Sequence, residues 1–144
     1  MTAEGERGTT TSFNVPEEVQ GPLRRASQLF GDLMDYIDNL AGANGEDIRS
    51  VIILRSAEVF GVVQLAGVLF GFKCQESLQK AIKTYSLMVE KVLDWLYSGA
   101  DYKAGLELEG LIFKYEVGIY LLLAGCAGIG AVVPYYEEGG GSDN

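Results

Sequence analysis

The sequence predicts an all-α protein of four helices, arranged as two tandem helical hairpins. Three features of the 144-residue chain lead to this prediction: an internal repeat, apolar positions at helical spacing, and two long apolar stretches. In each unit, an amphipathic helix is followed by an apolar one. The expected divisions are a flexible N-terminal segment over 1–13, a first unit over 14–72, a second unit over 73–136 and an acidic, glycine-rich tail over 137–144.

The internal repeat relates residues 17–67 to residues 76–125. The segment Asp-Tyr-Ile at 35–37, for example, returns as Asp-Trp-Leu at 94–96. Repeated units are expected to fold alike and to pack against one another. The repeat therefore constrains the architecture, although it names no activity.

The first amphipathic helix is expected to begin at Asn14, with Glu17 as the partner residue of a capping box. Pro16 suits the first turn of a helix, because a backbone N–H at that position would have no partner within the helix. Gly42 is expected to end the helix. Apolar residues recur within it at spacings typical of one helical face: Leu23, Leu29, Phe30, Leu33, Met34, Ile37 and Leu40.

The second amphipathic helix is expected to end near Ser98 and Gly99. Its apolar residues follow a similar pattern, so the same kind of core-facing stripe is predicted. They are Leu78, Ile82, Tyr85, Met88, Val92, Trp95 and Leu96.

The apolar elements cover residues 51–72 and 110–136. Both are too long for single strands and lack alternation, so helices are predicted. Glycine inside a helix costs roughly 1 kcal/mol relative to alanine. It is tolerated where neighbouring helices approach closely, as they do in membrane bundles. A tightly packed soluble core is the other interpretation of these glycines. The candidate packing glycines are Gly61, Gly67, Gly71, Gly118, Gly125 and Gly128.

Membrane insertion is the main question that these stretches raise. The segment between Glu116 and Glu137 carries no charge and reaches the roughly 20 apolar residues that a span requires. Residues 51–72 include Arg55 and Glu58, which are expected near the helix end, where a charge costs less. We therefore expect a membrane-embedded fold. A soluble bundle, oligomeric because its apolar helices need covering, is the alternative.

Lysines give an orientation for the membrane-embedded arrangement. If both apolar helices span, the lysine-rich middle of the chain would be cytoplasmic, both ends would be outside, and the two units would be inverted. The lysines of this middle segment are Lys73, Lys80, Lys83, Lys91 and Lys103.

Composition excludes several classes of function. The net charge is −9, so binding of nucleic acid is not expected except through a local patch at Arg24 and Arg25. No histidine is present, which removes the commonest general base and transition-metal ligand. No phosphate-binding loop or dinucleotide fingerprint occurs either. We expect no catalytic site, no metal and no cofactor, and the polar N-terminus predicts no cleaved signal.

The two cysteines, Cys74 and Cys126, do not occupy equivalent positions in the repeat. Two cysteines without a CxxC motif predict two buried or interfacial thiols rather than a disulfide framework.

Four charged residues are the sharpest site candidates. Glu58 and Glu116 are equivalent in the repeat and lie in apolar helices. Arg55 shares a helical face with Glu58 and can pair with it, whereas Lys114 is expected to pair with Glu58 or Glu116 of a neighbouring helix. An ion-pair network between the units is the leading interpretation. A cation or proton site is the alternative.

The leading function expected from these observations is a non-enzymatic structural or scaffold protein. It would assemble with copies of itself, in or on a membrane, through its apolar helices, so that copies of the chain and lipid are its expected partners. One alternative is a soluble coat or shell subunit, such as a helical virion protein, and another is a small oligomeric channel or carrier.

Overall fold

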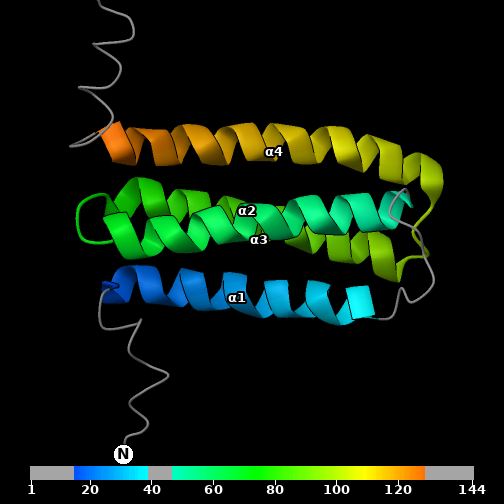
Figure 1. Ribbon diagram of the computed structural model, residues 1–144, viewed down its shortest axis with the longest axis horizontal. Helices are drawn as coiled ribbons and strands as arrows, with labels where there is room; N and C mark the ends of the chain where they lie inside the picture. Colours follow the sequence, from blue (N-terminus) through cyan, green and yellow to red (C-terminus); the bar gives the residue numbers. More distant parts are fainter. Residues whose placement is uncertain (1–14, 39–46, 129–144) are drawn as a thin grey trace, which may run out of the picture.

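The computed structural model describes residues 15–38 and 47–128, which form four helices (Figure 1). No strand occurs in these two ranges, so the predicted all-α fold of four helices is confirmed. The helices are α1 (Glu17–Asp38), α2 (Ile48–Phe70), α3 (Gln75–Tyr97) and α4 (Tyr102–Gly128).

Two helices begin at residues that differ from the expected ones. At the start of α1, the N–H groups of Val19 and Gln20 donate to the Pro16 carbonyl, at 2.9 and 3.1 Å, whereas the expected cap, Asn14, lies outside the described residues. Helix α4 begins at Tyr102 instead of within the apolar stretch that starts at residue 110. The reason is a side-chain cap, because the Asp101 carboxylate accepts the Ala104 N–H at 2.9 Å.

Other expected helix ends lie outside the described ranges. These are the end of the first helix at Leu40 and Gly42, residues 129–136 of the second apolar stretch, and the acidic tail over 137–144.

Helix α2 is capped by Asp47, which sequence analysis did not identify. Its carboxylate accepts the Arg49 N–H at 2.8 Å and also binds the Arg49 guanidinium, at 2.9 Å. These hydrogen bonds lower the pKa of Asp47 to about 2. The side chain therefore satisfies one of the free N–H groups of the first turn and adds a negative charge at the positive end of the helix dipole.

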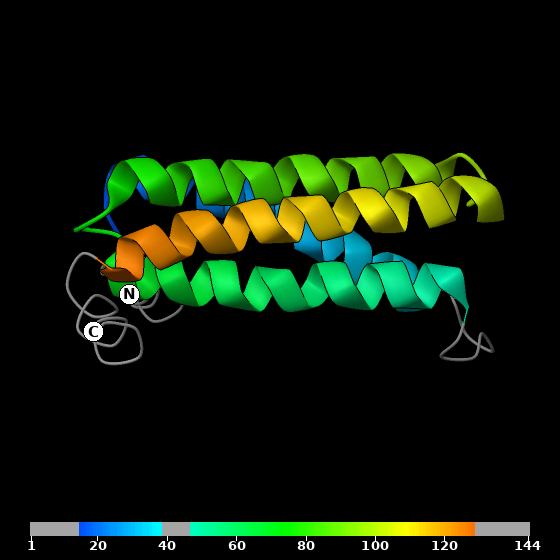
Figure 2. The ribbon, with the colours of Figure 1, turned by 90° about the horizontal axis from the view of Figure 1, so that it is seen from above.

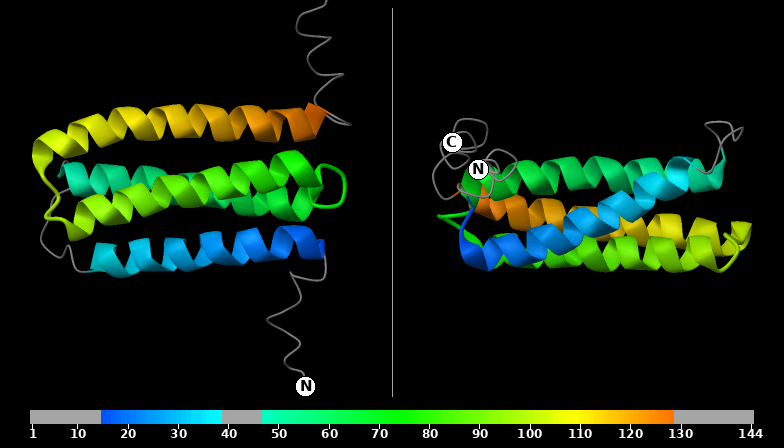
Figure 3. Two further views of the ribbon diagram at one scale, coloured as in Figure 1. Left: turned by 180° about the vertical axis from the view of Figure 1, so that it is seen from behind. Right: turned by 90° about the horizontal axis from the view of Figure 1, so that it is seen from below.

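The four helices run alternately up and down the bundle. Helices α2 and α3 occupy the middle, and α1 and α4 lie on opposite sides of them (Figures 1 and 2). As a result, α1 runs parallel to α3, and α2 runs parallel to α4, as the views from behind and below also show (Figure 3). Each of these parallel pairs is in contact.

This arrangement corrects the expected membrane orientation. The sequence suggested that the two apolar helices would be inverted, with all of the middle segment on one side. They run in the same direction instead, because α3, which follows α2 and precedes α4 along the chain, runs back over the full length of the bundle (Figure 1). Any orientation that places α2 and α4 across a membrane must therefore also carry α3 across it.

The core lies between the four helices and contains the predicted stripe of α3, all seven residues of which are buried. From the predicted stripe of the first helix, Leu29 and Leu33 are buried. An aromatic cluster links three helices, since Phe60 of α2 stacks on Phe30 of α1, with ring centroids 4.5 Å apart, and approaches Tyr85 of α3 at 5.6 Å. Amphipathic periodicity therefore correctly predicted which faces of α1 and α3 point inward.

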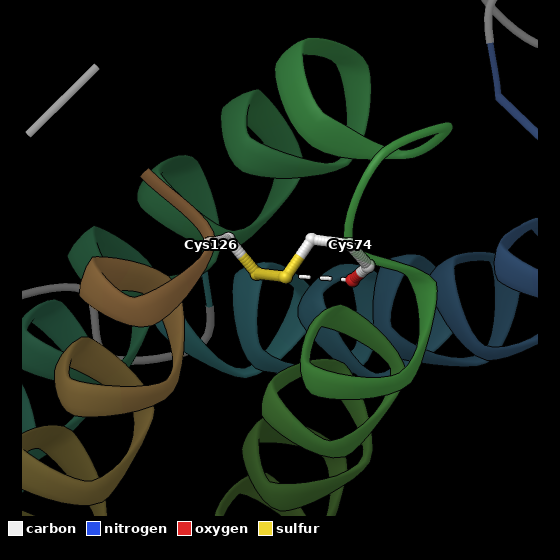
Figure 4. Close-up of a disulfide and its surroundings, with 2 residues drawn as sticks. All are labelled: Cys74 and Cys126. Atoms are coloured by element: carbon white, nitrogen blue, oxygen red, sulfur yellow. Dashed lines mark hydrogen bonds between the residues drawn. A yellow bond between two sulfur atoms is a disulfide. The ribbon is translucent and has the colours of Figure 1, made fainter. Parts of the chain in front are cut away.

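A disulfide joins Cys74 to Cys126 (Figure 4). Cys74 immediately precedes α3 and Cys126 lies in the last turns of α4, with the two Cα atoms 5.4 Å apart. The prediction of two thiols was therefore wrong. Spacing could not reveal the pair, because its residues are 52 positions apart and meet only through the packing of α4 beside the α2–α3 turn.

Candidate functional site

Helices α2 and α4 place large apolar side chains on the surface of the bundle. The α2/α4 face, as we call this surface, lies on the side of the two helices away from the core. Its α2 residues are Leu54, Val62, Leu65 and Leu69, and its α4 residues are Leu106, Phe113, Val117, Tyr120 and Leu121, all exposed.

The spacing of the α2/α4 face follows the helical period. On α2, positions 54, 58, 62, 65 and 69 succeed one another at intervals of three or four, and on α4 so do positions 106, 110, 113, 117 and 120. Intervals of this kind form a continuous stripe along a helix, as in seams where helices pack together. Each helix therefore has two apolar stripes: one in the core and one on the surface.

The outer surfaces of α1 and α3 differ sharply from the α2/α4 face. Among the exposed large apolar side chains of the described residues, α1 has none and α3 has Leu87 and Tyr97. Charged residues occupy the outer positions instead, and we call this surface the α1/α3 face. Its exposed charged residues are Glu17, Glu18, Arg24, Arg25, Asp32, Asp35 and Asp38 on α1, and Glu76, Lys80, Lys83, Lys91 and Asp94 on α3.

An ion cluster connects α2 to α4 on the α2/α4 face. The Arg55 guanidinium lies 2.8 Å from a carboxylate oxygen of Glu116 and 3.5 Å from one of Glu109. The Glu116 side chain is only 14% exposed and that of Arg55 is 30% exposed. Of the four candidate residues, the structure thus brings together Arg55 and Glu116, and it adds Glu109, which lies two turns before Glu116 on the same side of α4.

Glu58 and Lys114 do not join this cluster. Both are exposed, and neither forms an ion pair with another of the described residues. Glu58 also lies near the middle of α2, not near its end as expected, because the helix begins at Ile48 and ends at Phe70. Desolvation, followed by the negative charges of Glu116 and Glu58, raises the pKa of Tyr120.

The candidate packing glycines divide into two groups. A Cβ at Gly67 would lie 3.3 Å from Leu23 of α1, and one at Gly71 would lie 2.8 Å from Pro16, so these two allow α1 to approach α2. At Gly61, Gly118 and Gly125, an added Cβ would meet nothing within 4 Å. Gly128 is the last residue of α4.

Gly105 was missed in the sequence analysis. A Cβ there would lie 2.6 Å from the ring of Trp95, whose indole N–H donates to the Asp101 carbonyl at 2.8 Å. The start of α4 is therefore packed directly on the end of α3, and only a residue without a side chain fits this contact.

The candidate basic patch is divided between two grooves. Arg25 pairs with Glu90 of α3 at 3.0 Å, whereas Arg24 lines the groove between α1 and α2. Because the two side chains lie on different sides of α1, they do not form a single basic surface.

Two further features concern chemistry. Within the described ranges, no group of three His, Cys, Asp or Glu side chains could hold a metal ion. The Tyr85 hydroxyl is buried without a hydrogen-bond partner among these residues, and burial raises its pKa.

By length and composition alone, α2 and α4 are also long and apolar enough to cross a membrane, with mean hydropathies of 1.7 and 1.4.

In comparisons with known proteins, no protein-family model, no curated protein and no solved structure matches this chain.

Proposed function

We propose that this protein is a non-enzymatic structural subunit that assembles with copies of itself through the α2/α4 face. The observation that carries the proposal is the second apolar stripe on each of these helices. Contiguous exposed apolar surface is uncommon on monomeric soluble proteins and marks interaction sites. Stripes with three- and four-residue spacing are suited to packing against other helices.

The ion cluster within the face is compatible with such an interface. Arg55 already has two carboxylate partners in its own chain, so covering the face would not leave its guanidinium unpaired. An unpaired buried charge would be strongly unfavourable, and the cluster avoids this cost.

The charged α1/α3 face supports self-assembly over insertion of a single bundle across a membrane. Spanning would carry α3 and its outer charges into the hydrocarbon core, and each charge near the centre costs at least roughly 2.5–3.5 kcal/mol. Covering the α2/α4 face with a second copy leaves the α1/α3 face in water and incurs no such cost.

The test compares two substitutions of exposed leucines. Leu65, 58% exposed, lies on the α2/α4 face, and Leu87, 47% exposed, lies on α3. Sedimentation-velocity and light-scattering measurements on the full chain should show an oligomer for the wild type. Leu65→Glu should weaken association at least about a hundredfold, because it puts a charge into an apolar contact, whereas Leu87→Glu should leave the oligomer unchanged.

Circular dichroism should show folded helices for both variants, because both positions are exposed. A monomeric wild-type protein would overturn the proposal. So would an equal loss of association in the two variants, since it would mean that the α2/α4 face has no special role.

A second candidate is a membrane-bound structural protein in which lipid covers the α2/α4 face. The lengths and mean hydropathies of α2 and α4 favour it. Flotation with phosphatidylcholine vesicles distinguishes the two candidates: binding that Leu65→Glu abolishes and Leu87→Glu retains would favour lipid, provided that the protein is monomeric without vesicles.

A further inference from the structure

Glu58 and Lys114 lie at nearly the same height on the bundle. Arg55 contacts both Glu109 and Glu116, so residue 55 of α2 is level with the turn of α4 midway between those two glutamates. Because α2 and α4 run in the same direction, a rise of about 1.5 Å per residue places Glu58 within roughly 3 Å of the height of Lys114.

Both residues are exposed charges associated with the apolar stripes. Glu58 occupies a position within the α2 stripe, between Leu54 and Val62. Lys114 lies three residues before Val117 and seven before Leu121, so it is on the same side of α4 as these two residues of the α2/α4 face. Neither has an ion-pair partner among the described residues. A negative charge on α2 and a positive charge on α4, at one height, are complementary to the same face of a second copy.

The symmetry of the dimer determines which charges meet. With a two-fold axis parallel to the helices, α2 of one copy lies on α4 of the other, and heights are preserved. Glu58 of each copy then meets Lys114 of its partner, twice per dimer. With the axis perpendicular to the helices, α2 lies on α2, and like charges meet when the faces overlap fully, which is unfavourable.

We propose that two copies of the chain form a parallel, two-fold symmetric dimer, in which the α2/α4 faces meet and Glu58 of each copy pairs with Lys114 of the other. This inference rests on the proposed self-assembly and specifies its geometry. The face is large enough, because two helices of about 23 residues present roughly 35 Å by 20 Å, or about 700 Å². A stable interface of standard size buries about 600–1,000 Å² per partner, a range that includes this value.

The test uses charge reversal at both positions, in the full chain. Glu58→Lys alone and Lys114→Glu alone each place like charges opposite one another at two points, so each variant should raise the dissociation constant at least about tenfold. Mixing the two variants in equal amounts creates a dimer in which both contacts again join opposite charges. The mixture should therefore associate like the wild type, and so should the doubly substituted chain.

Each other outcome has a distinct meaning. If both single variants dimerise like the wild type, the charge pairing is wrong while self-assembly stands. If the doubly substituted chain dimerises but the mixture does not, the charges pair within one chain, and the proposed dimer is also wrong. A monomeric wild-type protein would instead contradict the proposed self-assembly itself. Thermal unfolding should show all variants folded, because both positions are exposed.

Discussion

The helix pairs α1/α3 and α2/α4 are alike on the inside of the bundle and different on the outside. All four contribute buried apolar residues to one core. Outside, α1 and α3 carry charges, whereas α2 and α4 carry a second apolar stripe. The core-facing stripe accounts for the packing within the bundle. The outer stripe of α2 and α4 therefore needs another explanation, and contact with a second molecule provides one.

The largest expected effect distinguishes the core stripe of α4 from its surface stripe. Ile112 is fully buried and its neighbour Phe113 is 59% exposed. Ile112→Ala should lower the free energy of unfolding by about 2–5 kcal/mol, because it leaves a cavity in the core. Phe113→Ala should change it by less than about 0.5 kcal/mol, yet it should weaken association. Urea denaturation of dilute protein measures the first quantity, and sedimentation the second.

Equal losses of stability in these two variants would contradict the distinction between the two stripes, because the surface stripe would then belong to the folding core.

The disulfide should give the next largest effect, since it ties the end of α4 to the start of α3. By the loop-closure estimate, a cross-link spanning 52 residues stabilises the folded state by about 4 kcal/mol. Cys126→Ser should therefore lower the free energy of unfolding by about 2–4 kcal/mol. Adding a reductant to the wild-type protein should give a similar loss.

A reductant should have no effect on the doubly substituted Cys74→Ser, Cys126→Ser chain, which is the matched control. Full retention of stability in reduced wild-type protein would show that packing alone holds α4 in place.

The smallest expected effect concerns the cap of α2. The pKa of Asp47 is lowered to about 2 from an ordinary value of 3.8, so ionised Asp47 stabilises the fold at pH values above about 4. This contribution is lost as the pH falls through 2. Asp47→Ala should cost about 1 kcal/mol at pH 7 and progressively less at lower pH.

Thermal unfolding between pH 7 and pH 2 checks this dependence. Asp47→Asn serves as the control, because its amide oxygen can still accept the N–H bond while carrying no charge. A cost for Asp47→Ala that stays constant down to pH 2 would contradict the role of the ionised carboxylate.

Much of the fold could be predicted because helical periodicity is local. The stripes of α1 and α3 identified their buried faces correctly, since amphipathic residues leave only one face that can enter a core. For α2 and α4, periodicity could not distinguish inside from outside, because both faces are apolar. Only packing determined that Ile112 lies in the core and Phe113 on the surface.

The candidate site was only partly accessible from the sequence. Repeat equivalence and charge identified Arg55 and Glu116, which the structure brings together. These two features of the sequence did not identify Glu109, because its contact with Arg55 depends on the lateral position of α4 against α2. The expected partner of Lys114 was Glu58 or Glu116 of a neighbouring helix, but the Lys114 side chain is exposed and lies apart from the Arg55 cluster.

The sequence by itself determined that the chain forms helices and which faces of two of them are buried. Both properties follow from residues within a few turns of each other. The tertiary structure alone decided that α2 and α4 run parallel, that Cys74 meets Cys126, and that the surplus apolar surface gathers on one side of the bundle. These depend on how helices far apart in sequence pack together, and no local pattern records that.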